Sequence, residues 1–370
     1  MHGGNIYGNE IEYDFSVNLN PLGPPDAVRE ALATALNHVE EYPDPEYREL
    51  RRALANYRRL AEEQFVLGNG ASELIPGIIR ALAPKTCMVT APCYSGYETA
   101  LNAAAPSCRI HRIFLREEDD FTLPENICRE IARVKSNLLI LTNPNNPNGK
   151  RISANRLREI AGACRTAGTV LLMDECFLAL SGGDEDSLIH RIGEEGLPPT
   201  VVLRAFTKTF AIPGVRLGYA VCSGSLAARI QRELPEWNLS VFAQYAGRAA
   251  LEAAAGGNVM RGTAAGGTPA PETSAGGTSG YLTASVEMVA REREYLMAEL
   301  ESLGFRVFPS DANYILFQSR DRELHQKLLD KGILIRDCRD YHGLTAGFYR
   351  TAVRTHRENT ALLRCLRNIK

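Results

Sequence analysis

The chain has 370 residues, of which 45% are hydrophobic and 23% charged, with a formal net charge of −2 at pH 7. This is the composition of a globular protein with room for two domains, and its 42 basic and 44 acidic residues give no sign of a nucleic-acid or membrane partner. No apolar run reaches the ~18 to 20 residues of a membrane helix, and no signal peptide is apparent. Nine scattered cysteines without a C-x-x-C pair favour buried thiols in a cytoplasmic protein over disulfides or a zinc site.

Helical and strand patterns alternate along the first two thirds of the chain. Helical periodicity is clear at residues 26–37 and 46–59, another helix should begin near Ser72, and a further one covers 153–167. Short apolar runs bounded by turn residues predict buried strands at CMVTAP, NLLILTNP, TVLLMDE, TVVLRAF and GYAVCS. The alternation predicts α/β layers around a mainly parallel sheet, and the short spacings around Val202 indicate one antiparallel strand.

The last third has a different organisation. Residues 255–280 are rich in Gly, Ala and Thr and hold almost no large apolar side chain, which predicts a mobile, low-complexity insertion of no recognisable chemistry. From Ser285 the sequence predicts a long amphipathic helix, then strands in FRVFPSDANYILFQ and GILIRDC. We therefore expect a large domain at 43–250 and a smaller α+β domain made of 1–42 with 285–370.

Four short stretches carry the chemistry. In LGNGASELI (67–75) two glycines precede a predicted helix start, where backbone N–H groups bind phosphate. TNPNNPNGK (142–150) follows a strand with a polar turn, and LLMDECF ends a buried strand with Asp174, a carboxylate that needs a cation or several donors. TKTFAIPGVR supplies Lys208 among apolar neighbours, and Arg216. Each stretch alone also fits a plain turn, helix cap, loop or surface lysine, but together they indicate pyridoxal 5'-phosphate.

With these motifs the chain resembles the aspartate-aminotransferase superfamily, fold type I of the pyridoxal-phosphate enzymes, over nearly its whole length outside 255–280. The resemblance implies a large, mainly parallel three-layer αβα domain and a smaller α+β domain. It also implies a homodimer with shared active sites. Lys208 would form the Schiff base with the cofactor and carry a proton, Asp174 would pair with the pyridine nitrogen, and Asn146 would bind the phenolic oxygen. The other matching cofactor positions are Tyr94 over the ring, Gly70, Ala71, Ser72, Thr207 and Arg216 around the phosphate, and Tyr42 from the other subunit.

Two positions depart from the family's pattern. Phe177 stands where aminotransferases commonly carry a tyrosine that reaches the phenolic oxygen, and Ala205 stands where a hydroxyl commonly reaches the phosphate. Neither change removes an essential group. The first indicates that the electronic state of the cofactor differs from that in a standard transaminase.

The ends of the chain bear on the substrate. HGGN (2–5), DFSVNLNPLGPP (14–25) and the segment from LIRDC to YRTAVR resemble the threonine-phosphate decarboxylases of cobalamin biosynthesis, and the general frame also resembles histidinol-phosphate aminotransferases. The first resemblance implies decarboxylation of O-phospho-L-threonine, or of phosphoserine, through a quinonoid intermediate. The second implies transamination with 2-oxoglutarate. A non-catalytic pyridoxal-phosphate sensor is a third interpretation, which the retention of Lys208, Asp174 and Arg216 and the lack of a basic patch disfavour.

A phosphorylated amino acid carries a carboxylate and a phosphate, so its pocket needs several cations. Arg350 matches the family residue that binds the α-carboxylate. Arg336 and Arg354 are candidates for the phosphate, with His2 and Asn20 nearby according to the resemblance. Decarboxylation and transamination differ by one rotation about the bond to Cα, and the sequence leaves this choice open.

Overall fold

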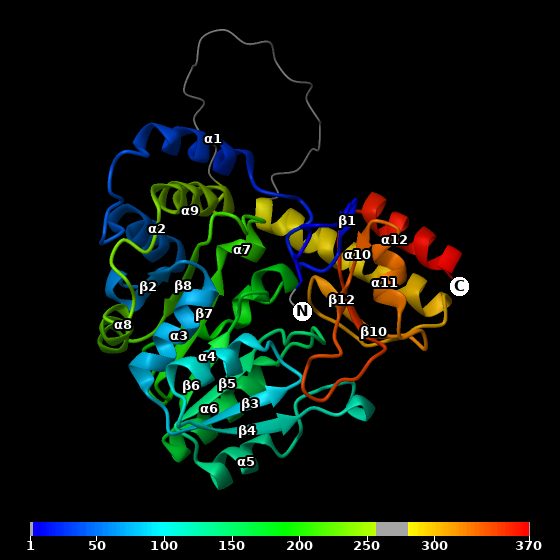
Figure 1. Cartoon of the computed structure of the whole chain (residues 1–370). Coiled ribbons are helices and arrows are strands. Elements are labelled where there is room, and N and C mark those ends of the chain that lie inside the picture. Colours follow the sequence, from blue (N-terminus) through cyan, green and yellow to red (C-terminus); the bar gives the residue numbers. More distant parts are fainter. Residues whose placement is uncertain (1–2, 257–279, 370) are drawn as a thin grey trace.

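The computed structural model describes residues 3–256 and 280–369. A seven-stranded sheet forms the centre of the larger of two units (Figure 1). Its strands in chain order are β2 (Phe65–Gly68), β3 (Thr86–Ala91), β4 (Arg109–Phe114), β5 (Leu138–Thr142), β6 (Val170–Asp174), β7 (Thr200–Ala205) and β8 (Gly218–Val221). Their order in space is β2-β8-β7-β6-β5-β3-β4.

Strand β8 runs against both of its neighbours. It pairs antiparallel with β2 and β7, whereas the pairs from β7 to β4 are parallel, which confirms the predicted antiparallel strand in a mainly parallel sheet. The central strands are almost wholly apolar because both faces of the sheet are covered there, whereas the edge strand β4 carries Arg109, His111 and Arg112 and is largely exposed. In β5, for example, Leu139 and Leu141 enter one core, and Leu138 and Ile140 enter the core on the other face.

Helices cover both faces and complete three layers (Figure 1). The helices of this unit are α1 (Asp26–Ala35), α2 (Arg48–Arg58), α3 (Ala71–Leu82), α4 (Gly96–Ala104), α5 (Ile127–Val134), α6 (Ala154–Ala167), α7 (Phe206–Thr209), α8 (Gly224–Gln231) and α9 (Val241–Ala254), and the 3-10 helices are η1 (Leu36–His38), η2 (Glu62–Gln64), η3 (Glu117–Asp119), η4 (Leu178–Ser181), η5 (Asp184–Asp186) and η6 (Leu188–Arg191). Helices α1, α2, α5, α6 and α9 pack on one face, and α3, α4 and α8 on the other.

The smaller unit is built around a four-stranded antiparallel sheet of order β12-β13-β10-β9. Its elements are β1 (Tyr13–Asp14), α10 (Tyr281–Ser302), β9 (Arg306–Val307), β10 (Tyr314–Gln318), α11 (Leu324–Leu329), β11 (Ile333–Leu334), β12 (Arg336–Asp337), β13 (Phe348–Ala352) and α12 (His356–Ile369). The N-terminal segment joins this unit, since β1 pairs with β11 and Phe15 lies in the core with Leu296 and Leu363. The long helix predicted from Ser285 is therefore present as α10.

The packing of α1 bears on the domain boundary. Val28 lies in the core of the large sheet with Leu50 and Ala243, so residues 26–42 pack with the large unit although the expected division placed 1–42 in the small domain. We propose a boundary before α1, with the segment up to about residue 24 joining residues 285–370. The expected insertion at 255–280 lies almost entirely outside the described residues. In the described ranges, no helix is both long and apolar enough to cross a membrane.

Candidate active site

A cavity of about 280 Å³ lies where β5, β6 and β7 end, between the large sheet and the small unit. Thr142, Asp174 and Ala205 line it from the ends of these three strands. Open α/β sheets bind ligands at this edge because the strands end there and the connecting loops diverge. Most of the predicted cofactor residues meet in its wall: Ala71, Ser72, Tyr94, Asn146, Asp174, Phe177, Thr207, Lys208 and Arg216.

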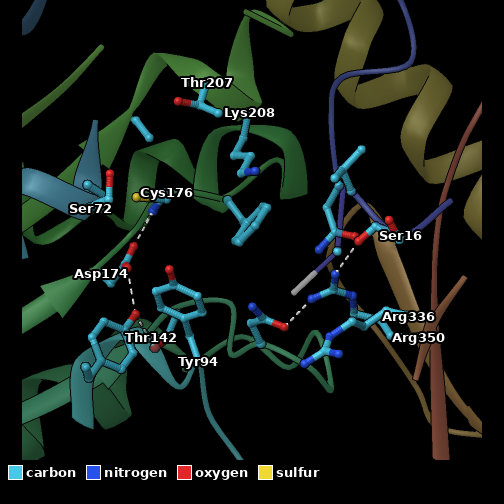
Figure 2. Close-up of a pocket in the computed structure, with 18 of the residues that line it drawn as sticks. Ser16, Ser72, Tyr94, Thr142, Asp174, Cys176, Thr207, Lys208, Arg336 and Arg350 are labelled. Atoms are coloured by element: carbon cyan, nitrogen blue, oxygen red, sulfur yellow. Dashed lines mark hydrogen bonds between the residues drawn. The ribbon is translucent and has the colours of Figure 1, made fainter. Parts of the chain in front are cut away.

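Lys208 points into the middle of this cavity. It lies on the short helix α7, which Phe206 and Phe210 anchor in the core with their rings stacked 5.3 Å apart. Figure 2 shows Lys208 between Asp174 on one side and Arg336 and Arg350 on the other. Burial, together with the positive charges of Arg350 and Arg216, lowers the pKa of Lys208 to about 8. Roughly a tenth of this amine is therefore uncharged at pH 7, far more than for a lysine at its ordinary value, and this fraction can attack an aldehyde.

This pKa predicts how the cofactor-free protein captures pyridoxal phosphate. The neutral amine is the reactive form, so the capture rate should rise with pH through about 8 and then level off once the amine is deprotonated. With an ordinary lysine pKa of 10.5, the capture rate would still be rising at pH 10. Stopped-flow absorbance between pH 6 and 10.5 measures this rate. A rate that continues to rise up to pH 10.5 would contradict the lowered pKa. By linkage, the free energy of unfolding should also rise with pH between 8 and 10.5, where only the unfolded lysine retains its proton.

Asp174 is a buried carboxylate whose hydrogen-bond donors among the described residues are neutral groups. Tyr97 Oη donates to Asp174 Oδ2 at 2.6 Å, and the Cys176 backbone N–H donates to Oδ1 at 2.9 Å. Burial and the charge of Asp174 keep the pKa of Tyr97 well above its usual value, so this phenol remains a donor. The carboxylate lines the cavity without an ion pair to any described cation, and it therefore fits a protonated ring nitrogen. Tyr97 was not predicted, although APCYSGY places it about one helical turn after Tyr94.

The start of helix α3 forms an anion cradle with Arg216. Ser72 Oγ accepts from Arg216 Nη2 at 2.8 Å, and Gly70 stands at the helix N-cap with φ +75°. A Cβ on Gly70 would lie 2.7 Å from Arg216 Nη2, so glycine is what lets the guanidinium lie over the helix start. Arg216 itself has φ +59°, a strained value for a non-glycine residue that is typical of functional sites. The cradle, Asp174 and Lys208 match the phosphate, ring nitrogen and aldehyde of pyridoxal phosphate.

Two arginines of the small unit line the opposite wall. Arg336 of β12 and Arg350 of β13 are direct cross-strand partners, and their exposed fractions are only 6% and 5%. Arg350 donates to Asn146 Oδ1 at 2.5 Å and to the Ser16 carbonyl at 2.7 Å, and its buried Nε has no acceptor among the residues that the structure describes. Arg336 donates to both carboxylate oxygens of Asp340 at 2.7 and 2.9 Å.

Three other predicted site residues, Arg354, Asn20 and Tyr42, do not line this cavity. Arg354 Nη2 donates to Oε1 of Glu358, in the first turn of α12, at 2.6 Å. Asn20 is buried, but its amide donates to the Thr209 carbonyl and to Tyr281 and Ser285 hydroxyls, so it ties α7 to α10. Both side chains are engaged in contacts within the chain, and the expected substrate contacts of Arg354 and Asn20 stay predictions. Tyr42 is 84% exposed, and its ring contacts that of Trp237. His2 lies outside the described residues.

Asn18 lies in the cavity wall where Asn20 was expected. Its exposed fraction is 2%, and its Oδ1 atom has no hydrogen-bond partner in the described part of the chain. A buried acceptor without a donor costs free energy, so a ligand donor at this point would be favoured. The stretch DFSVNLN contains both Asn18 and Asn20, and the sequence alone could not show which of the two lines the cavity.

The two departures from the family pattern are also visible. Phe177 meets the ring of Tyr314 edge-on at a centroid distance of 5.0 Å, and Tyr314 Oη donates to the Asn145 carbonyl at 3.0 Å. The Tyr314 hydroxyl is therefore directed to the backbone and does not replace the missing one. Ala205 lines the cavity without a donor, so the described side chains for the phosphate are Ser72, Thr207 and Arg216.

Comparisons with known proteins agree with this geometry. The profile of the family described as aminotransferase class I and II matches residues 10–366. Threonine-phosphate decarboxylase from Salmonella typhimurium is 33% identical over 384 residues, which cover 100% of this chain and 96% of that protein. Histidinol-phosphate aminotransferase 2 from Archaeoglobus fulgidus is 29% identical, with 96% and 92% covered. The crystal structure of the histidinol-phosphate aminotransferase from Clostridium acetobutylicum matches with a TM-score of 0.81 at 27% identity, covering 96% of this chain and 98% of that one.

Proposed function

This chain belongs to the aminotransferase class I and II family of pyridoxal-phosphate enzymes, and from this premise we propose that it decarboxylates O-phospho-L-threonine. The product is (R)-1-amino-2-propanol phosphate, and the resemblance to threonine-phosphate decarboxylases implies that this compound is used in cobalamin biosynthesis. The 33% identity to a threonine-phosphate decarboxylase over the full chain supports this activity over the aminotransferase alternative.

The observation that carries the proposal is the cross-strand arginine pair. Like charges directly opposite one another destabilise a sheet, and two buried guanidinium groups repel strongly unless anions compensate them. Asp340 compensates Arg336, whereas the hydrogen-bond and ring partners of Arg350 within residues 3–256 and 280–369, the amide of Asn146, the Ser16 carbonyl and the Tyr314 ring, carry no negative charge. A substrate with a carboxylate and a phosphate supplies the missing negative charge. Four basic side chains and one acidic side chain line the cavity in the described structure, which favours such a ligand.

The roles of the chain's residues follow from their positions. Pyridoxal phosphate supplies an electron sink for the charge that remains when the bond from Cα to the carboxylate breaks. Arg350 binds the substrate carboxylate, and Arg336 binds the phosphate. Asp174 holds the ring nitrogen protonated, and Ser72, Thr207 and Arg216 hold the cofactor phosphate. After CO2 has left, Lys208 Nζ delivers a proton to Cα, for which its lowered pKa is suited.

The direct test is to give cofactor-loaded protein O-phospho-L-threonine without any keto acid. CO2 and aminopropanol phosphate formed in equal amounts support the decarboxylase. Absence of CO2, with glutamate formed from histidinol phosphate and 2-oxoglutarate, would assign the protein to the aminotransferases and refute the decarboxylase. The cofactor residues would keep the same roles in that case.

Asn18 and Asn20 provide a matched pair of variants. Asn18→Ala should raise the KM for O-phospho-L-threonine roughly tenfold and leave the free energy of unfolding unchanged or higher, because an unpaired buried acceptor is removed. Asn20→Ala should do the reverse. It should lower the free energy of unfolding by about 1–3 kcal/mol and change KM little, since its bonds hold α7 to α10. Thermal unfolding and steady-state kinetics measure both effects, and an exchange of the two phenotypes would contradict the structure.

We also propose that the active enzyme is a cytoplasmic homodimer with shared active sites. Leu36, Val39, Tyr42 and Trp237 form an exposed apolar group around η1, with the Tyr42 and Trp237 rings 5.3 Å apart. In a dimer, Tyr42 would reach the cofactor phosphate of the partner subunit. Sedimentation equilibrium tests the dimer, and a Tyr42→Phe variant with unchanged affinity for pyridoxal phosphate would refute the contact.

A further inference from the structure

The anion-binding half of the cavity contains one aliphatic side chain. This half is formed by Gly3, residues 16–18, Arg336, Tyr341 and Arg350. Its neighbours offer hydroxyl, amide, guanidinium and phenol groups, and among the described residues of this half Val17 alone carries an aliphatic side chain. A valine that faces a ligand cavity gains free energy from an apolar part of the ligand, because the contact removes both surfaces from water.

The backbone around Val17 is fixed on both sides. The Phe15 N–H donates to the Leu334 carbonyl at 2.7 Å, and the Ser16 carbonyl accepts from Arg350 at 2.7 Å. The Leu19 N–H donates to the Val17 carbonyl at 3.2 Å. Val17 is therefore held on the same short segment that anchors the carboxylate-binding arginine.

The N-terminal segment packs against the side chain of Val17. The Gly4 N–H donates to Ser16 Oγ at 2.7 Å, and a Cβ on Gly4 would lie 2.9 Å from Val17 Cγ1. Gly4 has φ +85°, a conformation that glycine adopts without strain. The two glycines of HGGN thus let this segment lie close on residues 16 and 17.

A substrate that spans Arg350 and Arg336 must place its β-carbon between its two anionic groups. In O-phospho-L-threonine this carbon carries a methyl group, and in O-phospho-L-serine it carries hydrogen. We infer that Val17 contacts the β-methyl group and is the residue that makes the enzyme prefer phosphothreonine to phosphoserine. This inference rests on the proposed function, because it assumes that both anions of the substrate are bound in this half of the cavity.

The test compares kcat/KM for the two substrates in Val17→Ala, Val17→Thr and the unaltered enzyme. Val17→Thr keeps the shape of the side chain and replaces one methyl group by a hydroxyl. It therefore separates the loss of an apolar contact from a loss of folded protein. Val134→Ala, a partly buried valine of α5 far from the cavity, is the matched control. The ratio of kcat/KM for phosphothreonine over phosphoserine should fall roughly tenfold in both Val17 variants and stay constant in the control.

The outcomes separate this inference from the proposed function. A ratio within twofold of the unaltered enzyme in both Val17 variants would overturn the role of Val17 while leaving the decarboxylase intact. If neither substrate releases CO2, the proposed function fails. The role of Val17 is then tested by the ratio of the dissociation constants of the two phosphorylated amino acids, measured by calorimetry on cofactor-loaded protein. A binding ratio that falls in the Val17 variants retains Val17 as the contact for the methyl group, and an unchanged binding ratio removes it.

Discussion

Replacement of Lys208 by alanine is expected to abolish covalent retention of pyridoxal phosphate and to lower the rate of CO2 release about 10³-fold or more. The amine lies in the middle of the cavity, and burial with two nearby arginines lowers its pKa to about 8. No other lysine lines the cavity in the described structure, so none can replace it. Borohydride reduction followed by peptide mass spectrometry should find the cofactor on Lys208 in the unaltered protein and on no peptide of the variant.

The control for this experiment is Lys331→Ala, which removes an exposed lysine of the small unit. It should leave visible absorbance, cofactor content and activity unchanged. A Lys208→Ala protein that still binds the cofactor covalently would refute the assignment of Lys208. Since this variant removes a partly buried amine that lacks full hydration, its thermal stability without cofactor should not fall, and a loss of fold would therefore not explain the loss of activity.

The second large effect is expected from Arg350→Ala, which should lower kcat/KM for O-phospho-L-threonine by roughly 10²–10³-fold. The guanidinium is buried and lacks a carboxylate partner in the described structure, so the substrate carboxylate would lose its counter-ion in a site with little water. Arg350→Lys should recover only part of this loss, because an ammonium group cannot bind Asn146, Ser16 and a carboxylate in the same plane. Steady-state kinetics with both variants measure the effect.

Arg354→Ala is the matched control, because Arg354 follows the same strand but is paired with Glu358 outside the cavity. It should change kcat/KM no more than a few fold. Equal losses in Arg350→Ala and Arg354→Ala would contradict the placement of the substrate carboxylate. The stability of the cofactor-free Arg350→Ala protein separates binding from folding, since the relief of repulsion with Arg336 offsets the two lost hydrogen bonds.

Much of the large unit could be predicted from local sequence. The strands β3, β5, β6, β7 and β8 read as apolar runs because both faces of the sheet are covered there, whereas β2 and the exposed edge strand β4 were not predicted. The predicted helices agree with α1, α2, α3 and α6 apart from a residue or two at their ends. The start of α2 shows why ends differ. Helical periodicity begins near Glu46, but Asp44 Oδ2 accepts from the Arg48 N–H at 2.8 Å and Tyr47 has φ +53°, so the helix begins at Arg48.

The sequence by itself determined the cofactor end of the site. The glycine loop, Asp174 and Lys208 lie where a strand ends or a helix begins, and Arg216 precedes the antiparallel strand β8. Parallel strands end, and an antiparallel neighbour begins, at the same edge of a sheet, so topology brought these local motifs together. The substrate end was decided by tertiary structure. The pairing of β12 with β13 set Arg336 against Arg350, and the path of the N-terminal segment placed Asn18 in the cavity and Asn20 behind it. These choices depend on strand register and on contacts between segments some 300 residues apart, such as Arg350 with Ser16, which no local pattern encodes.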